Sequence, residues 1–383
     1  MNGTGTFVAG VGRTDFSRRS GRSVAALGAA AAVAALRDSG LAAHDVDAVI
    51  PVGGSLFTED LMAALGLRDD VLDAYAPPGG NAGIASIGLA DVMLRSGTAE
   101  VVLIVLARNG RSGSRIARRV GLLPGQQFRE ALEQPHGWVA PAQWYAMIAR
   151  RHLELHGTPV AALAEVALTM RAHAQLNRGA QMYGRPITRA DYDASPYVTE
   201  PYRLLDCCLE TDGAVAVILT SRDRGGHGAR DIPLLACRTA RPESADDLTN
   251  RRDWMRIGLT LAAPAAFEAA GLGPEDVDAA MIYDCFTFEV LHQLEEAGFC
   301  ARGGAAEFVL SGRIRLGGQL PVNTHGGLLS EGHLLGLGHV AESVRQLRAE
   351  ADRRQVDGAR VVAVTGWGDW GDGSLALFGR RER

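Results

Sequence analysis

Two similar nine-residue stretches, 231 residues apart, constrain the fold of this chain more than any other feature. Residues 40–48 read GLAAHDVDA and residues 271–279 read GLGPEDVDA. Each copy follows an alanine-rich run with helical periodicity, Val24–Ser39 or Leu259–Ala270, and precedes a short apolar run typical of a strand. The repeat therefore predicts two copies of one α/β unit.

The elements that follow the two copies come in a similar order. The predicted helices lie at 84–95 and 336–351, and the predicted strands at 49–52, 101–107, 213–220, 280–283, 361–365 and 373–378. We expect each half to bury a mostly parallel sheet. The halves are predicted at 1–225 and 226–383, with the boundary in the polar segment 221–231 and a helical loop domain inserted in the first half at about 109–200.

All 39 basic residues are arginines, because the sequence contains no lysine. This excludes a Schiff-base lysine, either for a carbonyl substrate or for pyridoxal phosphate, and it excludes the lysine of a P-loop. The formal net charge of -5 argues against a nucleic-acid partner. We interpret the grouped arginines Arg111, Arg115, Arg118 and Arg119 as a solvated face.

The same composition predicts a cytoplasmic protein without a membrane helix or a metal site. No apolar stretch reaches ~18 residues, the length that spans a bilayer. The five cysteines are odd in number and lack paired CxxC spacing, so neither a disulfide framework nor a zinc site is expected. No cluster of His, Asp and Glu has the spacing of metal ligands.

The segment 322–348 is the richest in reactive side chains. It contains His325, His333 and His339 among closely spaced glycines, and it leads into a predicted helix. A glycine-rich loop that enters a helix directs backbone N–H groups toward an anion or a developing oxyanion. A flexible connection would explain any one histidine, but two in one such loop favour a site. We therefore place His325 and His333 in the candidate site and give His339 a structural role.

A second candidate stretch begins at the end of the strand predicted at 280–283. Ligands of open α/β sheets bind beyond the carboxyl ends of strands, and alternation puts Tyr283 and Cys285 on one side and Asp284 on the other. A core tyrosine and a catalytic tyrosine fit this position equally well. For Cys285 an inert buried thiol is favoured. A third stretch, 202–213, is expected to hold packed cysteines and turn-forming aspartates.

Together these stretches resemble the thiolase superfamily, in its sterol-carrier-protein-X-type and lipid-transfer-like branch. The motifs are PYRLLDCC followed by TDGAVAVILTS, then YDCFTFEVLHQLEEAGFC and NTHGGLLSEGHLLGLGHVAESVRQLR, and the match covers essentially the whole chain. The resemblance implies an α/β thiolase fold, with duplicated halves in five αβαβα layers and a loop domain inserted in the first. It also implies a homodimer.

The sequence departs from a condensing thiolase at both cysteines of that reaction. The resemblance places Gly80 where a thiolase holds its acyl group on a nucleophilic cysteine. The first cysteine of this chain is Cys207 and none follows Cys300, so the second, acid–base cysteine is missing as well. The resemblance assigns the oxyanion-hole histidine to His333, and it puts Tyr283 where thiolases carry Asn or His.

This pattern is similar to the thiolase-like aldolases of steroid side-chain degradation, which cleave a β-hydroxyacyl-CoA into a ketone or aldehyde and a shorter acyl-CoA. In that group a tyrosine matches Tyr283, and another commonly takes the place of His333. The resemblance implies a retro-aldol carbon–carbon lyase with a CoA thioester as substrate and no tightly bound cofactor. His333, with His325, would hold the thioester oxygen, and Tyr283 would take the β-hydroxyl proton. Because a free tyrosine has a pKa of about 10, a nearby dipole or histidine would have to favour its ionised form.

Two other functions are compatible with the sequence. One is an acyltransferase or condensing enzyme with a non-standard nucleophile, for which Cys285 is the nearest candidate. The other is a non-catalytic subunit that binds acyl-CoA or lipid. The cysteine-less aldolase branch is generally built with a small OB-fold, zinc-ribbon-type partner, so the resemblance also implies an α2β2 complex.

Overall fold

A nine-stranded mixed sheet forms the centre of the molecule. The computed structural model describes residues 5–76, 78–115, 126–221, 230–242, 251–368 and 371–380. In their order across the sheet the strands are β3 (Leu72–Asp73), β2 (Ala48–Val52), β4 (Val101–Asn109), β7 (Asp212–Thr220), β1 (Thr6–Arg13), β8 (Ile232–Ala240), β11 (Gly373–Gly379), β10 (Val361–Trp367) and β9 (Ala279–Met281).

Most neighbouring strands of this sheet are antiparallel, so the prediction of mostly parallel sheets was wrong. β2 pairs in parallel with β3 and β4, and β9 pairs in parallel with β10. The strands that close the two halves, β7 and β11, run antiparallel to both of their neighbours. β1 also pairs antiparallel with β8, which joins the two halves into one sheet. The sequence pattern showed buried strands correctly, but apolar runs alone do not fix strand direction.

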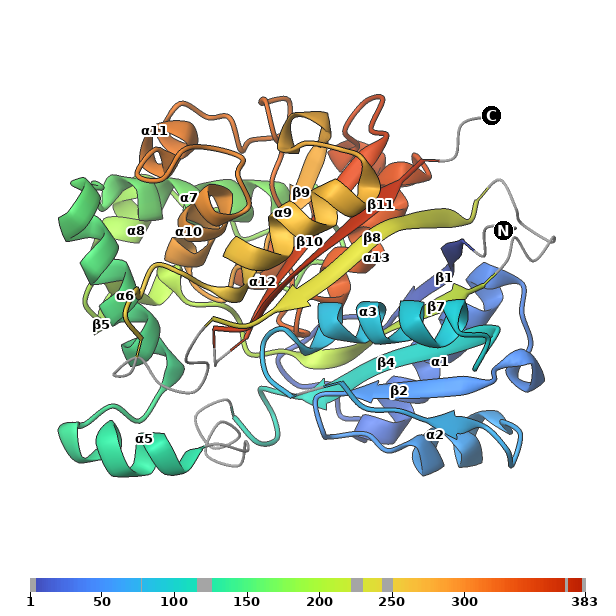
Figure 1. The fold of residues 1–383 in the computed structure, drawn as a ribbon. Coiled ribbons are helices and arrows are strands. Elements are labelled where there is room, and N and C mark those ends of the chain that lie inside the picture. The colour runs from blue at the N-terminus through green and yellow to red at the C-terminus, as the bar shows by residue number, and fades with distance from the viewer. Residues whose placement is uncertain are drawn as a thin grey trace.

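The strands of the two halves form two β layers, because helices lie between them as well as outside them. The result is the five αβαβα layers that were expected. α1 (Val24–Ser39) packs on β1, β4 and β7, and α9 (Gly258–Ala270) packs on β8 and β11, so these two helices cover the outer faces. α3 (Ala82–Arg95) and α13 (Leu337–Leu347) contact strands of both halves and form the middle layer. In Figure 1, α3 lies between β4 of the first half and β8 of the second.

The nine-residue repeat has the same structural role in both halves. Its glycines, Gly40 and Gly271, end α1 and α9 in the left-handed conformation, with φ of 71° and 67°. Its second aspartates then fix the next parallel strand: Asp47 Oδ2 accepts from the backbone N–H groups of residues 100 and 101, and Asp278 Oδ2 accepts from those of residues 360 and 361. The repeat is therefore a helix stop followed by a strand anchor.

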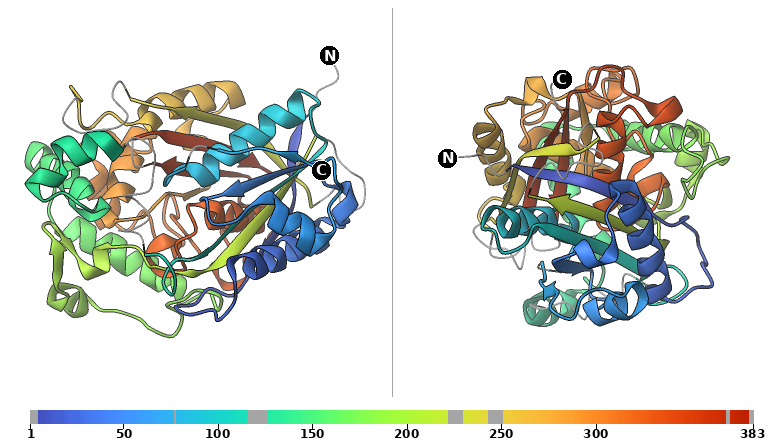
Figure 2. Two further views of the ribbon diagram at one scale, coloured as in Figure 1. Left: turned by 90° about the horizontal axis from the view of Figure 1, so that it is seen from below. Right: turned by 90° about the vertical axis from the view of Figure 1, so that its right-hand side faces the viewer.

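In the described part of the segment between β4 and β7, residues 110–115 and 126–211, most of the regular structure is helical, as expected. Figures 1 and 2 show its green helices together at one end of the molecule, beside the orange helices of the second half. The remaining elements are α2 (Thr58–Leu65), α5 (Gln126–Leu132), η2 (Gln134–His136), α6 (Pro141–His156), α7 (Ala161–Ala174), α8 (Arg189–Ala194), β5 (Tyr197–Thr199), β6 (Tyr202–Arg203), η3 (Leu204–Asp206), α10 (Thr287–Glu296), α11 (Ala305–Leu310), α12 (Gly327–Ser330), η5 (Asp352–Arg354) and the repeat's short turns η1 (Ala43–Asp45) and η4 (Pro274–Asp276). Among the described helices, none is long and apolar enough to cross a membrane.

Two predicted elements end earlier than expected. β9 stops at Met281 because the next backbone N–H groups, of Ile282 and Tyr283, donate to the side chains of Asn323 and Thr365. α13 stops at Leu347, and Ala349 follows with a φ of 60°, which no helix continues. The expected boundary between residues 225 and 226 lies outside the described residues, so the division into two domains stays a prediction.

Candidate active site

A cavity of about 580 Å³ opens where loops of both halves meet the inserted segment. This volume is within the usual range for a small-molecule site. Much of its wall is apolar: Tyr145, Val198, Leu204, Leu205, Phe286, Leu329 and Leu335. Its reactive side chains are Tyr283, His333, Cys207, Cys208 and Cys285. The structure thus brings together two of the three predicted site residues, Tyr283 and His333.

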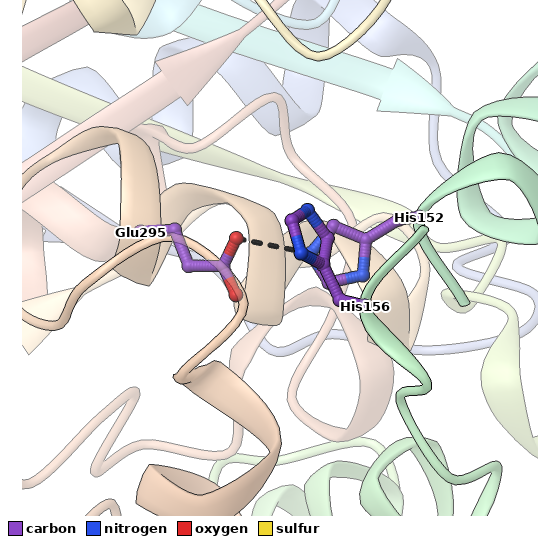
Figure 3. A group of neighbouring side chains, drawn as sticks. All are labelled: His152, His156 and Glu295. Atoms are coloured by element: carbon purple, nitrogen blue, oxygen red, sulfur yellow. Dashed lines mark hydrogen bonds and ion pairs between the residues drawn. The ribbon is translucent and has the colours of Figure 1, made fainter. Parts of the chain in front are cut away.

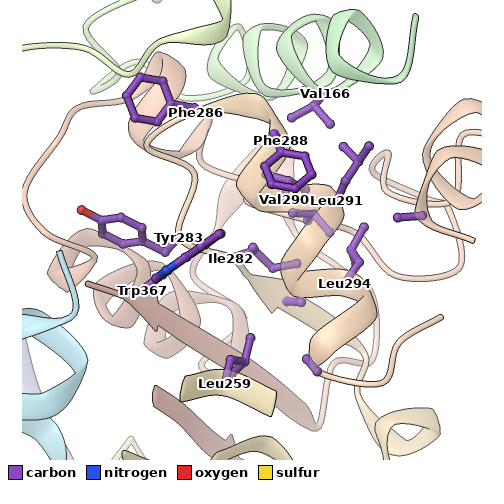
Figure 4. Close-up of a cluster of buried hydrophobic side chains, with 14 of the residues drawn as sticks. Val166, Leu259, Ile282, Tyr283, Phe286, Phe288, Val290, Leu291, Leu294 and Trp367 are labelled. Carbon is purple, nitrogen blue, oxygen red and sulfur yellow. The ribbon is translucent and has the colours of Figure 1, made fainter. Parts of the chain in front are cut away.

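Tyr283 is held rigidly at its backbone and presents its hydroxyl to the cavity. Its N–H donates to Thr365 Oγ1 at 3.1 Å, and its carbonyl accepts from Gln293 Nε2 at 2.7 Å. Thr365 and Gln293 also bond to each other at 2.6 Å. Figure 4 shows the ring at the edge of a buried apolar cluster, with the hydroxyl pointing away from those side chains. The tyrosine is therefore a buried ring with a positioned polar end.

His333 lies in the loop between α12 and α13, and its ring connects Tyr283 to Cys208. Its Nε2 is 3.2 Å from Tyr283 Oη, and its Nδ1 is 3.6 Å from Cys208 Sγ. Its backbone N–H donates to Thr211 Oγ1 at 3.0 Å. The preceding residue is a glycine, Gly332, whose backbone lies against the ring of Phe16. A Cβ at that position would be 2.7 Å from the ring, so a larger residue would displace the loop that carries His333.

Gly80 lies directly beside the Tyr283 hydroxyl, just before α3 begins at Ala82. A Cβ built on Gly80 would be 2.7 Å from Tyr283 Oη and closer still to the carbonyl oxygen of Trp367. The amino end of α3 therefore points at the place where Tyr283 and His333 meet. A helix N-terminus carries partial positive charge, which stabilises a developing anion there.

Two of the thiols in the cavity wall, those of Cys207 and Cys208, have a raised pKa and are therefore poor nucleophiles. Burial raises the pKa of Cys207 to about 12 and that of Cys208 well above its ordinary value, so both stay protonated at neutral pH. Cys285 Sγ donates to Glu289 Oε2 at 3.3 Å, and its neighbour Phe286 donates to the same oxygen. The sequence interpretation of Cys207 and Cys208 as packing residues missed the contact of Cys208 with His333.

His325 does not line the cavity and lies in a separate buried network. Its Nε2 is 2.9 Å from His339 Nδ1, and His339 Nε2 is 3.4 Å from Asp284 Oδ1. Burial and the neighbouring His339 lower the pKa of His325 well below its usual value, whereas burial raises the pKa of Asp284. The structure therefore places His325 with the structural His339 rather than with His333. Loop spacing alone could not distinguish the two, because the chain between them turns through α12.

Several arginines border the cavity, which the interpretation of their region as a solvated face did not anticipate. Arg18, Arg108, Arg111, Arg115 and Arg171 all contribute to its wall. Arg108 is buried, Arg111 is half-buried, and Arg18 and Arg115 are exposed. The other two members of the predicted group, at 118 and 119, lie outside the described residues. Glu210 also lines the cavity and forms an ion pair with Arg115, so the wall keeps an excess of positive charge that suits anionic groups.

Away from the cavity, the structure brings together three groups that could hold a metal ion: His152, His156 and Glu295. No metal site was expected from the sequence, because His152 and Glu295 are 143 positions apart. The four-residue spacing of the two histidines within one helix was the available signal.

Comparison with known proteins finds a thiolase-like family model and relatives that are lyases or aldolases. A family model described as thiolase C-terminal domain-like matches residues 241–378. The 17-hydroxy-3-oxo-4-pregnene-20-carboxyl-CoA lyase of Mycobacterium tuberculosis is 39% identical over 372 residues, which is 94% of this chain and 95% of that protein. A steroid side-chain-cleaving aldolase of Thermomonospora curvata is 36% identical over 376 residues, again 94% of this chain and 95% of the relative. Among solved structures, the Ltp2-ChsH2(DUF35) aldolase matches with a TM-score of 0.90 and 32% identity, covering 100% of both chains.

Proposed function

This chain belongs to the thiolase superfamily, in its branch of steroid side-chain-cleaving aldolases, and we propose that Tyr283 and His333 carry out its reaction. It is a CoA-dependent carbon–carbon lyase that cleaves a β-hydroxyacyl-CoA into a carbonyl compound and a shorter acyl-CoA. The observation that supports the residue assignment is the 3.2 Å separation of Tyr283 Oη and His333 Nε2 in one cavity.

Retro-aldol cleavage needs one base and one oxyanion site. The base removes the β-hydroxyl proton, the C–O bond becomes a carbonyl as the Cα–Cβ bond breaks, and the bonding electron pair passes to Cα as a thioester enolate. Return of a proton to Cα releases the shorter acyl-CoA. No step passes through a covalent acyl-enzyme, which agrees with the glycine at position 80.

The spacing of the two side chains matches the substrate. In a β-hydroxy thioester the hydroxyl and carbonyl oxygens can lie one hydrogen-bond length apart. Tyr283 Oη and His333 Nε2 are 3.2 Å apart, so one can bind each oxygen. Substrate binding then exchanges the Tyr283–His333 hydrogen bond for two bonds to the substrate: Tyr283 takes the hydroxyl proton, and His333 donates to the thioester oxygen.

Two features favour the protonation states that this mechanism needs. The half-buried Cys208 thiol has a raised pKa, stays protonated and faces His333 Nδ1, which favours the tautomer with its proton on Nε2. Before substrate binds, that N–H and the amino end of α3 beside Gly80 both stabilise negative charge on Tyr283 Oη; once the N–H turns to the thioester oxygen, the amino end of α3 remains. These are the histidine and the dipole that a tyrosine base requires.

The cavity wall is compatible with a large apolar acyl group joined to CoA. The apolar side chains give a surface for fused rings, and the arginines Arg18 and Arg111 supply cations for the phosphates of CoA, whereas Arg115 is paired with Glu210. We propose a steroid acyl-CoA with a hydroxyl β to the thioester, of the kind named for the relative from M. tuberculosis.

The proposed assembly is a cytoplasmic homodimer that binds a second, smaller protein. The support for the second protein is the similarity to the Ltp2-ChsH2(DUF35) aldolase, whose name includes a DUF35 component. An OB-fold, zinc-ribbon-type subunit would give an α2β2 complex with this chain.

Product analysis tests the proposed reaction. The chain, alone and co-expressed with a DUF35 protein, is incubated with a 17-hydroxy-20-carboxyl-CoA steroid, and the products are identified by mass spectrometry. Retro-aldol cleavage would give a 17-ketosteroid and a three-carbon acyl-CoA. An intact substrate in both preparations would favour a non-catalytic binding subunit, and a protein adduct on Cys285 would favour the acyltransferase.

A further inference from the structure

Two helices from distant parts of the chain bring a set of metal-binding side chains together. His152 and His156 lie four residues apart on α6, so they share one face of that helix, and Glu295 comes from α10. One ligand atom from each lies within 4.8 Å of the other two. Figure 3 shows both imidazoles on the side facing the Glu295 carboxylate, with His152 Nε2 2.9 Å from Glu295 Oε2.

The atoms around this cluster already orient its members. His152 Nδ1 is 3.3 Å from Thr158 Oγ1, an outer contact of the kind that fixes a ligating imidazole with Nε2 facing inward. Glu295 Oε1 accepts from the Ala305 N–H at 3.1 Å, which leaves Oε2 facing His152. Gly303, with a φ of 79°, lets its loop run beside the exposed His156, because a Cβ there would be 2.8 Å from His156 Nδ1.

We propose that His152, His156 and Glu295 bind one Zn²⁺, with a water molecule as the fourth ligand. Two imidazoles and one carboxylate are a donor set that Zn²⁺ accepts in tetrahedral geometry, with ligand bonds of about 2.0–2.2 Å. Binding would replace the hydrogen bond between His152 and Glu295 with two metal bonds. The solvent-exposed His156 closes the coordination by a rotation of its side chain.

The role of this ion is structural. None of the three residues is among the described residues that line the cavity. Both helices nevertheless reach the active site: α6 carries Tyr145, which lines the cavity, and α10 begins four residues after Tyr283. A metal at their far ends would link the inserted segment to the second half, so its binding stabilises the packing that positions Tyr283.

Zinc binding to the whole chain tests the proposal. Protein treated with chelator is dialysed against micromolar Zn²⁺, and bound metal is counted by mass spectrometry. We expect one ion per chain in the wild type, loss of that ion in His156→Ala and in Glu295→Gln, and retention in His44→Ala, an exposed histidine elsewhere. Because His156 is exposed, its replacement leaves the fold intact, and circular dichroism checks this.

Two further readouts separate this site from adventitious binding by cysteines. Co²⁺ in the site should give visible absorption without a sulfur-to-metal charge-transfer band. Zinc at a hundredfold excess over Kd should raise the Tm of the wild type by roughly 3–5 °C and leave that of His156→Ala unchanged. Absence of stoichiometric zinc in the wild type, equal zinc content in His156→Ala, or a thiolate band with Co²⁺ would overturn the proposal.

Discussion

The Tyr283 hydroxyl occupies the space that a side chain on Gly80 would need. A Cβ at position 80 would be 2.7 Å from Tyr283 Oη, less than the closest contact that such atoms normally make. A cysteine at position 80 and a tyrosine at position 283 are therefore incompatible in this backbone. The tyrosine hydroxyl thus fills the space of the missing thiol, and in the proposed mechanism it supplies a proton-transfer group there.

Gly80→Cys should abolish cleavage without creating a thiolase. The new side chain collides with Tyr283 and with the carbonyl of Trp367, so Tyr283 is displaced and the stability falls by about 1–3 kcal/mol, as in other overpacked sites. Turnover, Tm and the mass of the protein after incubation with acyl-CoA check this. A stable variant that accumulates an acyl adduct would show that the two side chains can coexist.

Substitutions of His333 should separate its donor function from its bulk. Loss of a positioned oxyanion donor lowers kcat by a factor of ~10²–10³, so the kcat of His333→Ala should fall by that factor. His333→Gln can place an N–H near the position of Nε2 and should retain more activity than His333→Ala. The kcat values of the two variants are compared on one β-hydroxyacyl-CoA. Equal losses would remove hydrogen-bond donation from the account of His333.

His325 should matter for stability and little for chemistry. It is hydrogen-bonded to His339 in a buried network outside the cavity, and breaking such a bond costs about 1–3 kcal/mol. His325→Asn should therefore lower the free energy of unfolding by that amount, while kcat of the folded protein changes by less than roughly fivefold. Denaturant unfolding and steady-state kinetics measure the two effects. A loss of kcat as large as that of His333→Ala would show that His325 takes part in the reaction.

Acid should destabilise the fold through His173. Burial lowers the pKa of His173 to about 4, and its Nε2 accepts the Leu316 N–H while its Nδ1 lies 3.2 Å from the carbonyl of Asn323. The unfolded histidine, with a pKa near 6.5, takes up its proton first as the pH falls. The contribution of His173 is therefore complete above about pH 6.5 and is lost down to about pH 4, by about 3 kcal/mol.

The variant His173→Gln isolates this effect. Glutamine can accept from Leu316 but does not titrate, so the variant should lose less stability than the wild type between pH 6.5 and pH 4. The exposed His44→Gln is the matched control and should behave as the wild type does. Parallel stability curves for His173→Gln and the wild type would contradict the assignment.

The repeat made the two α/β units predictable, because each copy forms its own helix end and strand contact from residues close together in the sequence. Gly40 and Gly271 stop helices by backbone conformation, and the aspartates that follow bind the next strand, so sequence-local chemistry is enough. Strand direction was not predictable in this way. β7 pairs with β4 although the inserted segment separates them in the sequence. The apolar residues of a buried strand also do not show whether it runs parallel or antiparallel to its neighbour.

The motifs of Tyr283 and His333 singled these residues out, and the structure places both in one cavity, while their catalytic roles stay a prediction. The site was not predictable where proximity comes from tertiary packing. The contact of Cys208 with His333 joins positions 125 apart, and the collision at Gly80 involves a side chain from the other half. His325 shows the converse, since it shares a loop with His333 but is drawn into a different network by His339.

The most direct test of the account compares two tyrosines that each lose only a hydroxyl. Tyr283→Phe should lower kcat on a β-hydroxyacyl-CoA by at least ~100-fold, the usual contribution of an acid–base group, while its circular dichroism and Tm stay close to those of the wild type. Tyr202→Phe, whose buried hydroxyl bonds to the backbone of Tyr145 at 3.4 Å, should change kcat by less than roughly threefold. Near-normal turnover in folded Tyr283→Phe would contradict the claim that Tyr283 takes the β-hydroxyl proton.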